Sequence, residues 1–195
     1  MTPMENAINQ IKSGNTVVMP TGTIWGILCR ADRDDAVEKL LAQKHRAPGK
    51  GRLLMNVADM GQIEKIAVVG DLARHLIEKY MPGGLTLVLP MRVGAVLSQH
   101  VVIRDTVAVR IPEGEIIGEL LRGAGLPLVS TSANITDDPP VENADAARAT
   151  FPDAFVFDTG EPLIGEPSTL AEVVDGKVEI LRQGGVVIDE LTIKN

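Results

Sequence analysis

Hydrophobic and polar positions follow two different periods along this chain, one typical of helices and one of short buried strands. Apolar residues recur every three or four positions in five segments, which we predict to be amphipathic helices. These segments are Met4–Ile11, Asp34–Gln43, Leu72–Tyr80, Glu115–Arg122 and Asn143–Thr150. Gly14 and Gly125 follow the first and the fourth segment, where a glycine is a common helix stop.

Short runs rich in aliphatic residues separate the helices and predict strands. The runs are Thr16–Met19, Leu53–Val57, Leu85–Leu89, Thr106–Ile111, Leu128–Ser130, Phe155–Phe157, Ser168–Val174 and Val178–Leu181. Asp175-Gly176 is a hairpin turn signal between the last two. Because strands and helices alternate without a strict order, we predict an α/β fold with a twisted, open, mixed sheet flanked by helices. The absence of repeats and of an interdomain linker predicts one domain over residues 1–195.

Composition narrows the choice of function and compartment. The hydrophobic content is 45% but aromatic residues make up only 3%, so the core must be aliphatic. The net charge of -7 disfavours extended nucleic-acid binding unless basic residues cluster locally. The single cysteine, Cys29, lies next to an apolar run and is expected in the core of a protein from a reducing compartment. With neither a signal peptide nor an apolar stretch of about 20 residues, we expect a soluble cytoplasmic protein without a membrane segment.

Two polar segments follow predicted elements and could form one site. The first contains Lys44 and Arg46, directly after the helix that ends at Gln43. Taken alone, a solvated helix end explains these two residues better than a ligand does. The second segment follows a buried strand and contains Ser130, Thr131, Ser132 and Asn134. Open α/β sheets place ligands outside the carboxyl ends of their strands, so the two segments together predict a pocket for an anion such as a nucleotide.

Further polar residues extend this candidate site, each with an alternative interpretation. Thr21 and Thr23 follow the first strand and either line a ligand or form an ordinary turn. Lys50 belongs to a Gly-Lys-Gly-Arg loop that is suited to anions but lacks the spacing of a P-loop. Arg110 ends an apolar strand, where it must either reach solvent or face a bound anion.

The sequence holds neither a Cys/His metal-ligand pattern nor a recognisable Ser/His/Asp triad. Any chemistry at the site must therefore rest on positioning and charge stabilisation rather than on a protein nucleophile.

Seven short motifs, in order along nearly the whole chain, carry a resemblance to a known family. They are Pro20-Thr21-x-Thr23-Ile24-Trp25-Gly26, Lys44-x-Arg46, Pro82-Gly83-Gly84-Leu85-Thr86-Leu87-Val88-Leu89-Pro90, Val107-Ala108-Val109-Arg110-Ile111-Pro112, Thr131-Ser132-Ala133-Asn134, Pro167-Ser168-Thr169 and Arg182-Gln183-Gly184. The chain resembles the YrdC-domain family, the L-threonylcarbamoyladenylate synthases, in its short single-domain form. This resemblance implies a twisted α/β sheet around a positively charged central cavity.

The resemblance also implies a reaction. ATP, L-threonine and bicarbonate would give threonylcarbamoyl-AMP and pyrophosphate, with Mg²⁺ accompanying ATP and no metal ligand from protein side chains. The product would serve the N6-threonylcarbamoyl modification of adenosine at position 37 of tRNA. The implied partners are tRNA and the proteins that transfer the threonylcarbamoyl group.

Carried over motif by motif, the resemblance assigns roles to individual residues. Nucleotide phosphates and reacting groups would be held by four catalytic residues, Lys44, Arg46, Ser132 and Asn134. ATP or substrate contacts would come from Thr21, Thr23, Lys50, Arg110, Ser130, Thr131, Ser168 and Arg182. Thr23 and its loop would contact threonine.

Three positions depart from the family's usual pattern. Gly22 stands where an acidic residue is usual, Trp25 replaces a Tyr or Phe, and Thr136-Asp137 replaces a Ser-Gly turn. We expect Trp25 to enlarge an aromatic wall near the threonine site. These departures motivate one alternative, a divergent YrdC-like paralogue acting on another amine or carbamoyl compound. A second alternative is a non-catalytic nucleotide- or RNA-binding module, which the acidic charge balance disfavours.

Overall fold

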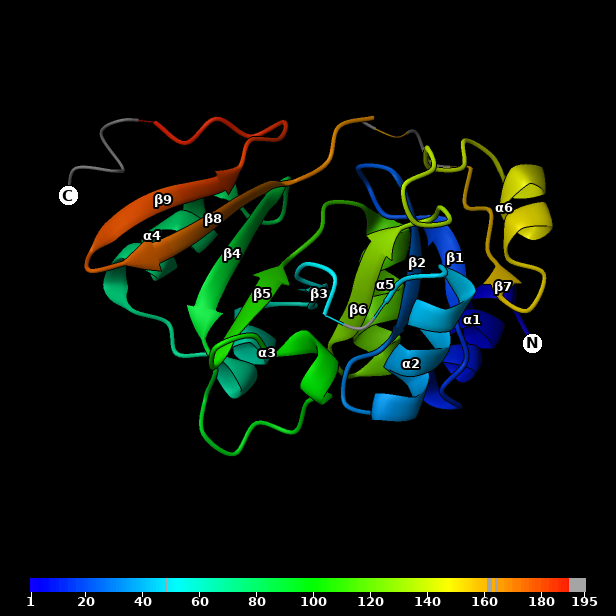
Figure 1. The fold of residues 1–195 in the computed structure, drawn as a ribbon, viewed down its shortest axis with the longest axis horizontal. Coiled ribbons are helices and arrows are strands. Elements are labelled where there is room, and N and C mark those ends of the chain that lie inside the picture. Colours follow the sequence, from blue (N-terminus) through cyan, green and yellow to red (C-terminus); the bar gives the residue numbers. More distant parts are fainter. Residues whose placement is uncertain (48, 161–162, 164, 190–195) are drawn as a thin grey trace.

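A single mixed β-sheet organises the part of the chain that the computed structural model describes, residues 1–47, 49–160, 163 and 165–189. Its strands are β1 (Val17–Pro20), β2 (Trp25–Arg30), β3 (Leu54–Asn56), β4 (Leu85–Pro90), β5 (Thr106–Arg110), β6 (Leu128–Ser132), β7 (Phe155–Val156), β8 (Thr169–Val174) and β9 (Lys177–Arg182). They lie in the order β7-β1-β2-β6-β3-β5-β4-β8-β9 (Figure 1). The pairs β1/β7, β3/β5 and β4/β8 are parallel and the others are antiparallel. The predicted mixed sheet is confirmed.

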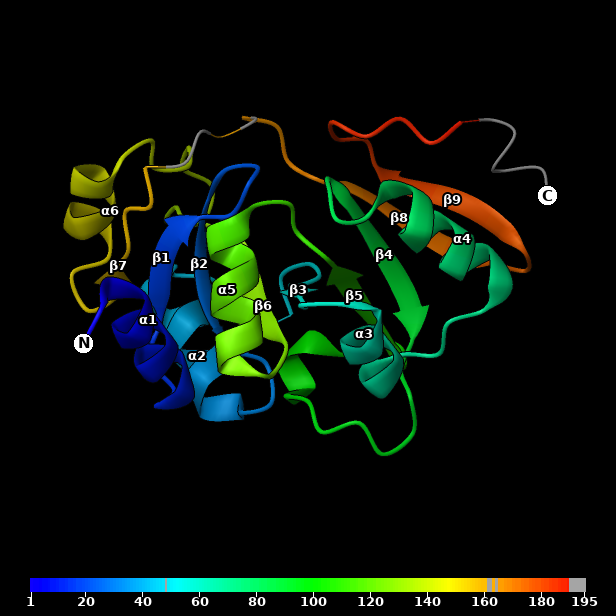
Figure 2. The ribbon, with the colours of Figure 1, turned by 180° about the vertical axis from the view of Figure 1, so that it is seen from behind.

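Helices cover both faces of the sheet. They are α1 (Pro3–Lys12), α2 (Asp34–Gln43), α3 (Met60–Ile66), α4 (Asp71–Tyr80), α5 (Glu115–Ala124) and α6 (Ala144–Thr150), with a 3-10 turn η1 (Gln99–Val101). Helices α1 and α5 lie together on one side of β1, β2 and β6, in front of these strands in Figure 2, and α2 lies on the opposite side. Among these described helices, none is long and apolar enough to cross a membrane.

The core is aliphatic, as the composition predicts, and forms two layers. Apolar side chains of α1 and α5 pack against one face of β1, β2 and β6. Helices α2, α3, α4 and α6 contribute to a larger cluster with side chains that point to the opposite face of the sheet. Cys29 is fully buried in this larger cluster, and burial raises the pKa of its thiol. The predicted structural role of this cysteine is confirmed.

Strand β2, helix α3 and the short 3-10 turn η1 were not among the elements predicted from the pattern. Strand β2 is buried over five consecutive residues, so it lacks the polar alternation that marks a half-exposed strand. Helix α3 has only seven residues and two buried positions, Ile63 and Ile66, too few to establish a period. Its start is fixed instead by Asp59, whose Oδ1 accepts a hydrogen bond from the Gln62 backbone N–H at 2.8 Å.

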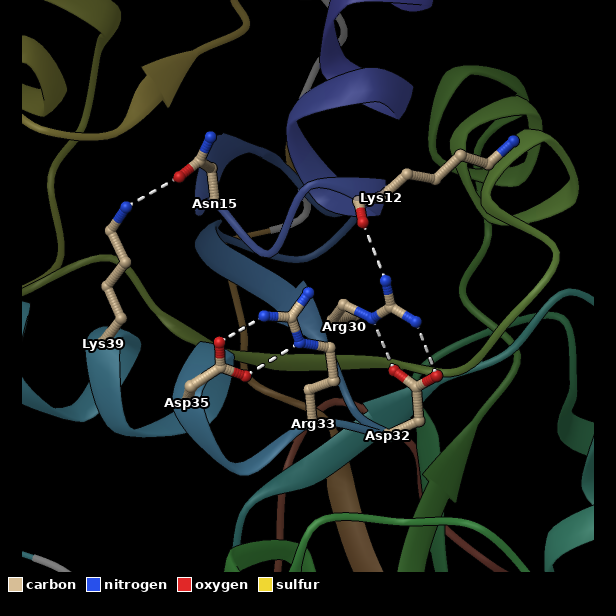
Figure 3. Close-up of polar contacts among 7 residues, drawn as sticks. All are labelled: Lys12, Asn15, Arg30, Asp32, Arg33, Asp35 and Lys39. Atoms are coloured by element: carbon tan, nitrogen blue, oxygen red, sulfur yellow. Dashed lines mark hydrogen bonds and ion pairs between the residues drawn. The ribbon is translucent and has the colours of Figure 1, made fainter.

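An ionic network joins the C-terminal end of β2 to the end of α1 (Figure 3). Arg30 donates to both carboxylate oxygens of Asp32, from Nε at 2.7 Å and from Nη2 at 2.8 Å. Its Nη1 donates to the Lys12 carbonyl oxygen at 2.7 Å. In the same region Arg33 pairs with Asp35, a more exposed pair. The bidentate geometry and the third hydrogen bond make the Arg30 pair the stronger of the two.

We expect Asp32→Asn to lower the free energy of unfolding by about 1 kcal/mol at pH 7, because a partly screened ion pair is lost. The hydrogen bond from Arg30 holds the pKa of Asp32 below its usual value. A depressed carboxyl pKa stabilises the fold above the unfolded value of about 3.9, and this contribution disappears as pH falls through the folded value. Denaturant unfolding at pH 7 and pH 3 should therefore show a difference between variant and wild type that shrinks in acid.

Asp35→Asn is the matched control, because Asp35 has the same bidentate type of partner but a far more exposed side chain. We expect it to destabilise the protein less than Asp32→Asn does. Equal effects of the two substitutions would contradict the structural role assigned to the Arg30 network.

Candidate active site

Polar residues from opposite ends of the sequence line one cavity of about 400 Å³. It lies over β2, β6, β3 and β5 and is closed on one side by the start of β8. Nine of the residues that the sequence singles out line it: Thr21, Thr23, Arg46, Arg110, Ser130, Thr131, Ser132, Ser168 and Arg182. The structure thus brings together most of the predicted set.

Strand register and one glycine keep the floor of the cavity open. Gly26 of β2 is paired with Ser132 of β6, and Ser130 is paired with Leu54 of β3. A Cβ atom at Gly26 would lie 2.6 Å from Cγ2 of Thr21 and 3.4 Å from Oγ of Ser130. Only glycine fits there without displacing the Thr21 side chain that forms the adjacent wall.

Lys44 is buried beside the cavity rather than solvated at the end of α2. Its side chain is 2% exposed, although it caps the helix. Its Nζ donates to the carbonyl oxygens of Ser132 and Asn134 and to Oδ1 of Asn134, the last two at 2.7 and 3.0 Å. Burial lowers the pKa of Lys44 to about 8, and the nearby charge of Arg46 adds to the shift. The solvated-end interpretation is excluded for this residue.

Ser132 and Asn134 form a compact cluster with Lys44 at one end of the cavity. Ser132 Oγ donates to Asn134 Oδ1 at 2.6 Å, and Asn134 Nδ2 donates to the backbone carbonyls of Ile135 and Asp138. An adjoining cavity of about 200 Å³ is lined by the whole cluster and by Arg46. The two segments separated by some ninety positions in sequence therefore meet, as predicted.

Arg46 connects the two cavities. Its Nε and Nη2 donate to the Lys50 carbonyl oxygen, the first at 2.9 Å, and Nη1 lies 3.5 Å from Thr131 Oγ1. Burial lowers the pKa of this guanidinium. Because backbone carbonyls are its main partners, it retains its full positive charge for a ligand.

Arg110 occupies the opposite side of the cavity. It is 3% exposed, so the alternative that it reaches solvent is excluded. Its Nε donates to the Gly83 carbonyl oxygen at 2.7 Å, and Nη1 donates to Thr23 Oγ1 at 3.1 Å. Burial lowers the pKa of Arg110 to about 10, an effect that the Glu113 charge partly offsets. Arg110 and Thr23 therefore act as one hydrogen-bonded unit.

Ser168 and Arg182 close the β8 side. The hydroxyls of Ser168 and Thr86 are 2.8 Å apart and buried. Arg182 Nη2 donates to the Ser168 carbonyl oxygen at 2.9 Å, which holds the exposed guanidinium at the cavity wall. Thr21 is fixed at the other wall, because its Oγ1 donates to the Ile24 carbonyl oxygen at 2.9 Å.

The two basic residues of the loop after Arg46, Lys50 and Arg52, line different cavities, a difference that the sequence did not predict. Lys50 lines the smaller cavity but not the larger one, and it forms an exposed ion pair with Asp137 at 2.8 Å. Arg52, which is close enough in sequence to Lys44, Arg46 and Lys50 to share a basic cavity but to which the family resemblance assigns no role, lines the larger cavity. The basic loop is visible in sequence, but which of its cations points inward depends on the backbone path into β3.

The structure shows the surroundings of two of the three positions that depart from the family pattern. Gly22 has φ +80°, and a Cβ there would lie 2.3 Å from the Glu113 carbonyl oxygen. Trp25 is 5% exposed and packs in the larger apolar cluster. It is not among the residues that line the cavity, so the expectation of an aromatic wall near the threonine site is wrong. Adjacent strand residues face opposite sides of the sheet, and Gly26, not Trp25, faces the cavity.

We expect Gly22→Ala to destabilise the protein by about 2–4 kcal/mol, because a strained φ and a steric clash add together. Gly49→Ala is the control, since Gly49 has φ +79° but no described atom beyond its chain neighbours within 4 Å of where its Cβ would be. Denaturant unfolding should show a clearly smaller loss for Gly49→Ala. If the two losses are equal, the close approach of Glu113 does not explain Gly22.

The cavity is built for an anion. Four guanidinium groups line it, those of Arg46, Arg52, Arg110 and Arg182, and no Asp or Glu is among its described lining residues. Among the residues that the structure describes, there is also no group of three or more His, Cys, Asp or Glu side chains placed to hold a metal ion. The cavity can therefore bind anions and stabilise negative charge as it develops.

Comparison with known proteins assigns this architecture to a family. The model of the Sua5/YciO/YrdC family, described as telomere recombination, matches residues 9–184. The chain belongs to this family. A threonylcarbamoyl-AMP synthase of Idiomarina loihiensis is 34% identical over 180 residues, covering 89% of this chain and 95% of that protein. The threonylcarbamoyl-AMP synthase of Bacillus subtilis is 30% identical over 93% of this chain.

The solved structures agree with the sequence comparison. Pyrococcus abyssi Sua5 complexed with L-threonine superposes with a TM-score of 0.84 at 29% identity, covering 93% of this chain and 54% of that chain. This chain likewise spans 53% of the Bacillus subtilis relative. It therefore corresponds to the Sua5/YciO/YrdC domain of those longer proteins, and to nearly the whole length of the shorter Idiomarina loihiensis relative.

Proposed function

We propose that this protein is an L-threonylcarbamoyladenylate synthase. ATP, L-threonine and bicarbonate react in the cavity to give threonylcarbamoyl-AMP and pyrophosphate. The observation that carries this proposal is the buried cluster of Lys44, Ser132 and Asn134 in the smaller cavity. Arg46 joins this cluster to the larger cavity, whose described lining contains no carboxylate. Family membership and relatives that bear this enzyme's name support it.

The reaction has two bond-forming steps. Bicarbonate takes up a proton and releases water to give CO₂, and the amine of threonine adds to this CO₂, loses a proton and becomes a carbamate. A carbamate oxygen then attacks the α-phosphorus of ATP, and the bond from that phosphorus to the bridging oxygen of pyrophosphate breaks. Negative charge accumulates on the leaving pyrophosphate and on the α-phosphoryl oxygens, so cations placed there lower the barrier.

We assign the two ends of the cavity to different substrates. Lys44, Arg46, Ser132 and Asn134 are catalytic and face the phosphates, with Ser130, Thr131 and Lys50 nearby. Arg110 and Thr23 form the amino-acid end, where a guanidinium suits a carboxylate. Thr21, Ser168 and Arg182 complete the walls around the nucleotide and substrate.

Mg²⁺ enters as the counter-ion of ATP, with phosphate oxygens as its ligands. The labile product passes to the threonylcarbamoyl-transfer proteins that modify tRNA. We place this reaction in the cytoplasm, where ATP and tRNA are both present.

The proposal is tested by measuring pyrophosphate release by the purified protein. Release should require ATP, threonine and bicarbonate together, and omission of any one should remove it. A panel of amino acids at equal concentration distinguishes the main proposal from the divergent-paralogue alternative. If another amino acid is the best substrate, the protein is the divergent paralogue. If a folded protein binds ATP but releases no pyrophosphate, it is a non-catalytic binding module.

A further inference from the structure

The basic loop between α2 and β3 contributes a second inward-pointing guanidinium that the proposed catalytic set does not use. Arg52 lies two residues before Leu54, which is paired with Ser130. Because β3 and β6 are antiparallel, Arg52 enters the cavity at the end where Ser132 lies. Arg110, paired with Asn56, lies at the other end of β3. Arg52 therefore belongs to the phosphate end.

The Arg46 side chain also lies at this phosphate end of the cavity. Its Nη2 lies only 3.3 Å from where a Cβ of Gly51 would be, so the Arg46 guanidinium rests against the residue next to Arg52. Both side chains line the same 400 Å³ cavity. Two planar guanidinium groups in one cavity can each form paired hydrogen bonds with a phosphoryl group, a geometry that lysine does not provide.

Most hydrogen-bond donors of the Arg52 guanidinium have no partner within the described part of the chain. Within the described part of the chain its guanidinium makes one hydrogen bond, from Nη1 to the Thr106 carbonyl oxygen at 3.2 Å. The side chain is half-buried, and none of the described carboxylates forms an ion pair with it. The charge of Glu172 acts on it only from a longer range, against that of Arg104. A partly desolvated cation with free donors is best satisfied by an anionic ligand.

We propose that Arg52 binds the diphosphate portion of the nucleotide and the pyrophosphate formed from it, as a partner of Arg46. Arg52 is thus a specificity-determining residue for nucleoside triphosphates over monophosphates. This inference rests on the proposed function of the cavity. It assigns to Arg52 the groups beyond the α-phosphate, which AMP lacks.

Calorimetric titration of the full chain with pyrophosphate, ATP and AMP tests the proposal without any need for turnover. We expect Arg52→Gln to weaken pyrophosphate and ATP binding by about tenfold or more, since charge-assisted hydrogen bonds are lost, and to leave AMP binding within about twofold. Arg52→Lys, which keeps the charge but not the fork, should fall between Arg52→Gln and wild type. A general disturbance of the fold would weaken AMP binding as well.

Arg104→Gln is the matched control. Arg104 is exposed and close enough for its charge to act on Arg52, but it does not line the cavity. It should leave all three affinities within about twofold of wild type, as expected for a screened surface charge. Equal pyrophosphate affinity of Arg52→Gln and wild type would overturn the inference, as would an absence of pyrophosphate binding by the wild type. If pyrophosphate binding depends on Arg52 but no threonine-dependent product forms, the proposed reaction fails while the diphosphate site stands.

Discussion

Lys44→Met is expected to lower kcat/KM for ATP by about 10²–10³-fold, the loss typical of removing one preorganised charge-stabilising donor. Methionine has a similar length and leaves the aliphatic packing in place. It removes the buried cation that the oxygens of Ser132 and Asn134 hold beside the phosphate end. Steady-state pyrophosphate release measures the effect, and a thermal melt confirms that the variant is folded.

The protonation of Lys44 gives this prediction a second readout. Because the pKa of Lys44 is about 8, the cation is lost as pH rises through that value, whereas an ordinary lysine keeps its charge to about pH 10. The kcat/KM of the wild type should therefore fall above pH 8, and Lys44→Met should lack this limb. Lys39→Met, on the same helix but away from the cavity, should keep both rate and pH profile. A Lys44→Met protein with wild-type kcat/KM would remove Lys44 from the mechanism.

Arg110→Gln is expected to raise KM for L-threonine by about 10- to 100-fold while ATP binding changes little, because a charge-assisted contact to the amino-acid carboxylate is lost. The substitution also removes the donor that orients the Thr23 hydroxyl. Initial rates at varied threonine, together with calorimetric titration of ATP, separate the two ends of the cavity.

The exposed Arg122 on α5 offers the control for this substitution, since Arg122→Gln removes a guanidinium outside the cavity. Its KM for threonine should equal that of the wild type. Arg110→Gln that loses ATP binding and keeps its KM for threonine would reverse the assignment of the two ends.

The fold was largely predictable from local patterns, because its helices are amphipathic and most strands are short aliphatic runs between turn residues. Strand β2 was missed for a physical reason, since burial on both faces removes the alternation of polar residues. The pairing of β2 with β6 decides which side chains of β2 face the cavity. Gly26 faces it, and Trp25 therefore faces the core.

The motifs predicted which residues belong to the candidate site. They could not predict which side chains point into the cavity, because the backbone path decides this. The sequence alone favoured a solvated Lys44, because it could not show the oxygen atoms of Ser132 and Asn134 some ninety residues away. For the same reason the sequence could not show that Arg52, and not Lys50, lines the larger cavity. Their order in a basic loop is visible, but only the turn at Gly51, with φ +72°, and the entry into β3 direct Arg52 inward.

Incorporation of labelled bicarbonate is the most direct measurement of the central claim. The purified protein, given ATP, Mg²⁺, L-threonine and ¹⁴C-bicarbonate, should form a labelled adenylate whose mass is that of threonylcarbamoyl-AMP, with one pyrophosphate per label. Lys44→Met should lose this product. Pyrophosphate release without incorporated label, or label that appears equally without threonine, would contradict the account.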